Sequence, residues 1–191
     1  MNNRPEDRAE RERELGELAM RNIEWLAFPP TELEARTLSE VLKLPRVVVT
    51  RPPRNQLIAA GMVDYDCHRN CAAQEQHDHT GASRHVVGWS PHADDLILHS
   101  VVVIDGKWLC LTPQITPVAM HFDFIPDGKL EWREHADGTN RAYRDGQEMP
   151  TALRRDPGRH IRMRDQFMEL VRAGMSPFDA RAAVAKANDA T

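Results

Sequence analysis

Apolar residues recur at helical spacing near the start of the chain. Through residues 5–26 they lie among glutamates and arginines, a pattern that predicts an amphipathic helix with a charged outer face. Thr31 then stands three residues before Glu34, which is the spacing of a capping box. This spacing predicts a second short helix that runs toward Leu42 and ends before Pro45.

The last part of the chain returns to the helical pattern. Apolar residues mark one face of residues 161–171 and again of residues 178–185. Gly174 supplies the left-handed end of the first helix, while Ser176 and Asp179 cap the second. The pattern therefore predicts a helical hairpin.

The middle of the chain favours strands, because β-branched and aromatic residues gather there in short runs separated by turn residues. The predicted strands are residues 47–50, 84–89, 96–104, 107–111, 121–125 and 129–133. Asp105-Gly106 and Asp127-Gly128 each lie between two of these runs, and each pair predicts a tight hairpin. A coil is predicted before Cys67, and residues 134–157 are predicted to be mostly irregular.

Together these elements predict an α+β fold. A small antiparallel sheet packs on a central helix that begins at Cys67, and helices flank the sheet at both ends of the chain. The predicted parts are N-terminal helices (residues 1–44), an α+β core (residues 45–157) and a C-terminal helical hairpin (residues 158–191). With 191 residues, of which 41% are hydrophobic, the chain is long enough to bury one continuous core.

Charge and cysteine content narrow the classes of function. Basic residues number 25 and acidic residues 29, so the formal charge is −4, without the basic excess typical of nucleic-acid binders. The C-terminal hairpin has the outline of a helix-turn-helix but few side chains that read base edges, so nucleic acid is not the predicted partner. No apolar run reaches the roughly 20 residues that cross a bilayer, which predicts no membrane partner. Three cysteines without a leading secretory signal predict free thiols and a cytoplasmic location.

Cys67 and His99 are the candidate chemical groups. A thiol at the start of a helix and an imidazole on a later strand are two parts that a cysteine nucleophile needs, because the helix N-terminus favours the thiolate and the imidazole moves the proton. We expect the Cys67 sulfur to lie within reach of a His99 nitrogen. Asn70, near the same helix face, would stabilise the oxyanion together with backbone N–H groups.

The order of these motifs resembles the catalytic core of papain-like and transglutaminase-like cysteine enzymes, and more closely a bacterial family of small uncharacterised proteins. The motifs are Cys67-His68-Arg69-Asn70, Gly88-Trp89, His99-Ser100-Val101-Val102, Leu111-Thr112-Pro113 and Phe124-Ile125-Pro126-Asp127. The resemblance implies a papain-like core within residues 45–157 and an acid that orients the histidine. This chain has Cys110-Leu111 where the related proteins often have that acid, so either Gln114 or Asp123 is a candidate substitute.

The predicted function is that of a thiol-dependent acyl hydrolase or acyl transferase without a cofactor. Cys67 would attack the carbonyl of a peptide, a small amide or a thioester, and His99 would accept and return the proton. A structural role fits the same residues, with Cys67 as a small buried side chain and His99 as a hydrogen-bonded strand histidine.

Two other functions stay open. One is a non-catalytic interaction module on a papain-like scaffold, in which the sheet supports the structure and a protein partner binds the terminal helices. The other is a small zinc protein, since two thiolates and two imidazoles can hold zinc. The candidate ligands are Cys67, Cys71, His77 and His79.

Overall fold

The computed structural model describes residues 5–116, 118–137 and 139–188. It divides into two compact units: Glu32–Arg155, and the described residues on either side of that range. The predicted boundary after residue 44 differs from the observed one, because the second helix belongs to the larger unit. Leu33, Leu38 and Val41 of this helix pack with residues of the strands, such as Trp89 and Leu98.

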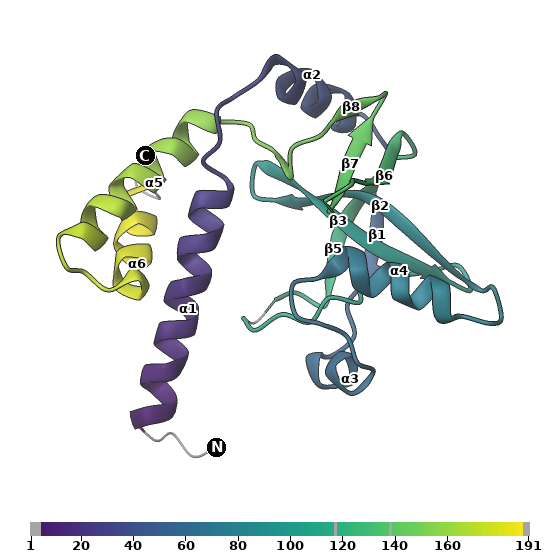
Figure 1. Cartoon of the computed structure of the whole chain (residues 1–191), viewed down its shortest axis with the longest axis horizontal. Helices are drawn as coiled ribbons and strands as arrows, with labels where there is room; N and C mark the ends of the chain where they lie inside the picture. The colour runs from purple at the N-terminus through teal and green to yellow at the C-terminus, as the bar shows by residue number, and fades with distance from the viewer. Residues whose placement is uncertain (1–4, 117, 138, 189–191) are drawn as a thin grey trace. The chain divides into compact units, whose positions relative to one another are not determined.

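The larger unit is α+β, as predicted, with a sheet that closes into a small barrel. Its elements are α2 (Glu32–Val41), β1 (Val47–Thr50), α3 (Arg54–Ala59), α4 (Cys67–His77), β2 (Ser83–His92), β3 (Asp95–Ile104), β4 (Lys107–Leu109), β5 (His121–Pro126), β6 (Leu130–Glu134), β7 (Asn140–Arg144), β8 (Gln147–Glu148) and β9 (Ala152–Leu153). Figure 1 shows α4 lying along the strands of the barrel, beside β3 and β2.

The barrel forms because five strands pair in a ring, in the order β2-β5-β1-β4-β3, and β3 pairs back onto β2. The β1–β4 pair is parallel and the other pairs in the ring are antiparallel. A sheet closed in this way leaves no unpaired edge within the ring. The short strand β9 pairs with the start of β3, while β6, β7 and β8 form a separate antiparallel sheet.

Side chains along each barrel strand point alternately to the inside and to the outside of the barrel. Val49, Val101, Cys110 and Phe124 form one buried cluster inside the barrel. On β3 the next residue, Val102, belongs to a different cluster, which includes Leu57 of α3 and Cys71 of α4. The helix α4 therefore covers the outer face of the barrel, and successive residues of β3 point alternately to the inner and the outer side.

The two predicted Asp-Gly hairpins have different outcomes. Asp105 and Gly106 have φ values of 48° and 75°, as a tight turn with two left-handed residues requires, and they join the paired strands β3 and β4. The second hairpin prediction is wrong. Asp127-Gly128 links β5 of the barrel to β6 of the separate sheet, and β6 pairs with β7 instead.

The Asp127 side chain explains why this turn does not form a hairpin. Its Oδ2 accepts hydrogen bonds from Trp89 Nε1 at 3.2 Å and from Arg144 Nε at 2.8 Å, and Asp127 is only 3% exposed. The carboxylate thus ties β2 to the second sheet.

Several short elements lie where coil was predicted. The helix α3 occupies part of the stretch before Cys67, and β7, β8 and β9 lie within residues 134–157. Strand β7 has a single buried apolar residue, Ala142, among polar ones. Such a segment carries almost no local strand signal.

The smaller unit consists of α1 (Pro5–Trp25), α5 (Pro157–Arg172) and α6 (Pro177–Asn188), which pack on one another. Its core contains Ala19, Phe167, Ala180 and Val184. The predicted hairpin between α5 and α6 is confirmed, since Gly174 has a φ of 94°. None of the described helices in either unit is long and apolar enough to span a membrane.

Candidate functional site

Cys67 begins α4, as the sequence predicted. Asp66 occupies the N-cap position, but its side chain makes no capping hydrogen bond. One residue further along, His68 Nδ1 lies 2.7 Å from Ser100 Oγ on β3. The start of α4 is therefore held against the face of β3 that carries Ser100.

His99 lies on the other face of β3, because it precedes Ser100 in an extended strand. Its Nε2 lies 3.3 Å from Cys110 Sγ, and its ring packs near Phe122 and Phe124. Within the described residues, no hydrogen bond joins His99 to Cys67. The structure pairs His99 with a different, fully buried thiol inside the barrel, and the acyl-transfer hypothesis loses the contact on which it depends.

Asn70 does not serve as a free oxyanion donor. Its Nδ2 donates to the carbonyl oxygens of Val63 at 2.8 Å and Leu111 at 3.0 Å, and its Oδ1 accepts from the Val63 N–H at 2.9 Å. The side chain is 3% exposed. Asn70 thus has a structural role, since its carboxamide joins the segment before α4 to the segment after β4.

Neither candidate for the orienting group contacts His99. Asp123 on β5 points to the outer face, where its carboxylate lies 3.3 Å from Arg46 Nη1, and both side chains are about half exposed. Gln114 lies beyond β4 and lines a surface pocket. The predicted set of five residues is therefore spread over the outer face, the inner face and the pocket.

A different histidine cluster was missed by sequence reasoning. The Ser100 hydroxyl lies between His68 Nδ1 at 2.7 Å and His85 Nε2 at 2.6 Å. Burial, followed by the charge of His99, lowers the pKa of His68 to about 3, and the pKa of His85 is lowered chiefly by burial. The two imidazoles are therefore neutral at neutral pH. Ser100 is fully buried, while the two histidines are partly buried. No local sequence signal joins the three elements that carry these residues.

The geometry gives no support to the zinc alternative. Among the residues that the structure describes, no three His, Cys, Asp or Glu side chains form a group that could hold a metal ion. His77 Nδ1 lies 2.9 Å from the Ala73 carbonyl oxygen of its own helix. The side chains of Cys67, Cys71, His77 and His79 thus do not converge on one point.

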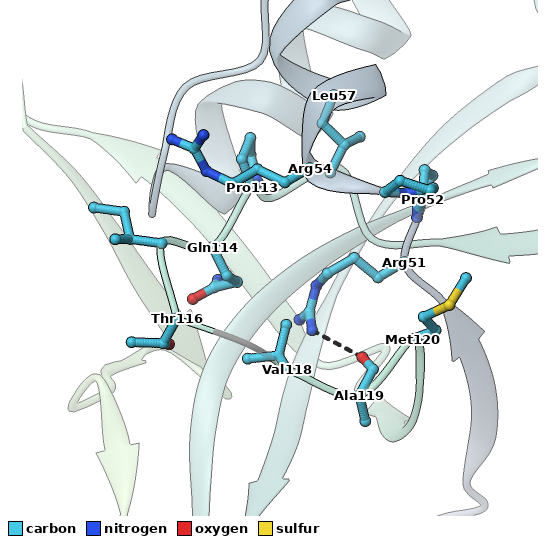
Figure 2. A pocket seen from close by; sticks show the side chains of 12 residues that line it. Arg51, Pro52, Arg54, Leu57, Pro113, Gln114, Thr116, Val118, Ala119 and Met120 are labelled. Atoms are coloured by element: carbon cyan, nitrogen blue, oxygen red, sulfur yellow. Dashed lines mark hydrogen bonds between the residues drawn. The ribbon is translucent and has the colours of Figure 1, made fainter. Parts of the chain in front are cut away.

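A pocket of about 270 Å³ lies where β1 ends and where the segment joining β4 to β5 passes. Figure 2 shows the Arg51 side chain crossing the ring of lining residues toward Ala119, whose carbonyl oxygen accepts a hydrogen bond from Arg51 Nη1 at 3.2 Å. Lining side chains include Pro52, Leu57, Gln114, Val118 and Met120. The mouth of a small barrel is a common place for a binding site.

Searches against models of protein families, curated proteins and solved structures find no match to this chain. The resemblance to papain-like and transglutaminase-like enzymes therefore stays a prediction.

Thiol labelling tests the reassigned roles of the cysteines. Cys67 is 9% exposed, and Cys71 and Cys110 are fully buried. Burial raises the pKa of the Cys71 thiol, and the nearby Cys67 and Cys110 add to the effect. We expect iodoacetamide at neutral pH to label all three slowly in the folded protein and rapidly in urea, as peptide mapping by mass spectrometry would show. Rapid labelling of Cys67 alone in the folded protein would restore the nucleophile hypothesis.

Proposed function

We propose that the chain is a non-catalytic interaction module that binds an apolar segment of a peptide partner in the pocket beside Arg51. The observation that carries this proposal is the combination of a concave site and exposed apolar side chains at its rim. Val118 is 45% exposed and Met120 is 58% exposed, and both line the pocket. Exposed apolar side chains grouped around a hollow are typical of binding sites.

The size of the pocket favours a peptide over a large ligand. Pockets for drug-sized molecules span roughly 300–1,000 Å³, whereas this one measures about 270 Å³. It has room for one or two side chains of a longer partner. Ile58, which is 43% exposed and follows the lining residue Leu57 on α3, would extend the contact beyond the pocket.

The burial of the chemical groups supports a binding role rather than catalysis. The Cys110 thiol beside His99 is fully buried, and so is the Ser100 hydroxyl between His68 and His85. A nucleophile must be reachable by its substrate. The separate prediction that a protein partner binds the terminal helices, and the predicted cytoplasmic location, stay predictions.

A peptide selection with matched variants tests the proposal. A library of random dodecamer peptides, displayed on phage through their amino ends so that each carboxyl terminus is free, is selected on the immobilised full chain. The enriched peptides are synthesised with a fluorescent label. We expect Val118→Trp, which fills the pocket, to weaken their binding by about tenfold or more in fluorescence anisotropy, a change of about 1.4 kcal/mol.

The control places the same side chain elsewhere. Val48 on β1 is 64% exposed and does not line the pocket, so Val48→Trp should leave the affinity within about twofold of the original, as expected for a surface change away from the contact. The proposal fails if no peptide is enriched, or if the enriched peptides bind the Val118→Trp variant as well as the original chain.

A further inference from the structure

Arg51 carries a charge that no acidic side chain balances. Within the described residues it forms no ion pair, and the hydrogen bond of its side chain runs from Nη1 to the Ala119 carbonyl oxygen at 3.2 Å. Its guanidinium lies 4.7 Å from the centre of the Phe122 ring, and its Nε is buried without a hydrogen-bond partner. A buried N–H of this kind calls for an explanation, because nearly all such groups in folded proteins are satisfied.

Two other arginines in the same unit are neutralised by carboxylates. Arg54, which also lines the pocket, has its Nη2 2.7 Å from Asp64 Oδ2. Arg144 pairs with Asp127 at 2.8 Å and with Glu40 at 2.6 Å. Of the two arginines that line the pocket, Arg54 is thus paired with a carboxylate, and Arg51 is not within the described residues.

Resting on the function proposed above, we propose that the pocket binds the carboxyl-terminal residue of a peptide, with its carboxylate on Arg51 and its apolar side chain among Leu57, Val118 and Met120. In a terminal residue the carboxylate and the side chain branch from the same Cα, so one pocket of about 270 Å³ receives both. An acidic residue within a peptide has chain on both sides and needs an open groove. Capture of terminal carboxylates is a recurring mode of peptide recognition, and the planar guanidinium matches a carboxylate in shape.

Paired peptides test the carboxylate contact. Each enriched sequence is transferred to the end of a synthetic peptide, made once with a free carboxyl terminus and once with a terminal amide, and titrated by fluorescence anisotropy. We expect the free acid to bind at least about tenfold more tightly than the amide, since one charge-assisted hydrogen bond is worth that much. Arg51→Met should reduce the ratio to about one, while Arg46→Met, at an exposed arginine outside the pocket, should preserve it.

The amide peptide also reports whether the variant pocket is intact, because its affinity should be the same for Arg51→Met and for the original chain. Equal binding of acid and amide to the original chain, with Val118→Trp still blocking both, overturns the carboxylate inference and leaves the interaction module standing. Failure of every peptide to bind overturns both. N-acetyl-leucine should compete only weakly, and if it binds as tightly as the peptide, the site takes a free small carboxylate and the peptide assignment is wrong.

Discussion

Replacing Glu34 by Ala is expected to lower the free energy of unfolding by about 3–5 kcal/mol, because it leaves the Arg154 guanidinium buried without its main counter-charge. The two side chains are 1% and 2% exposed. Arg154 Nε and Nη2 each donate to a different Glu34 carboxylate oxygen at 2.8 Å, and the Arg154 backbone N–H donates to the same carboxylate at 2.8 Å. The loss is measured by urea denaturation followed by tryptophan fluorescence.

Two further variants separate the loss of the pair from a general sensitivity to mutation. Asp123→Ala removes an exposed ion pair with Arg46 and should cost less than about 1 kcal/mol. Replacing Glu34 and Arg154 together by Met should cost less than Glu34→Ala, since no buried charge is left unpaired. A Glu34→Ala protein as stable as the Asp123→Ala protein would contradict the buried contact.

Gly88→Ala is expected to destabilise the barrel by about 3 kcal/mol or more, because the added methyl group has no room. A Cβ at this position would overlap the backbone carbonyl oxygen of Ile125 and lie 2.6 Å from Phe124 Cζ. Gly88 is paired with Pro126 in the short contact through which β2 meets β5. The backbone can move away only by loosening the pairing that closes the ring.

Gly128→Ala is the matched control, since a Cβ there meets nothing within 4 Å. Its stability should stay within about 0.5 kcal/mol of the original chain. Both variants are compared by thermal unfolding with circular dichroism. Equal melting temperatures for Gly88→Ala and Gly128→Ala would show that β2 and β5 are not packed as closely as described.

The sequence predicted elements whose signals are local. The amphipathic pattern of α1, the runs of β1 and β3, and the turn at Gly174 each depend on neighbouring residues, and the structure confirms them. The hairpin at Asp127 failed because its carboxylate bonds to Trp89 and Arg144, which are distant in the sequence. Contacts of that kind override local turn preference.

The expected contact between Cys67 and His99 is missing for a related reason. Cys67 at a helix start and His99 on a strand were each predicted in the correct element, but their meeting required His99 to face α4. A shift of one residue along a strand exchanges its two faces. The structure directs Ser100 toward α4 and His99 into the barrel, and the closure of the ring, which determines the faces, has no local signature.

The position of the larger unit within the chain has a consequence for synthesis. In the sequence, Glu32–Arg155 separates α1 from its partners α5 and α6. The small helical unit is therefore formed by two segments that are distant along the chain. During translation α1 is made before α5 and α6, and its apolar stripe lacks these two partners until the intervening unit has been made. A single amphipathic helix is only marginally stable in water. The heavily charged outer face of α1 would keep the growing chain soluble until α5 and α6 have been made.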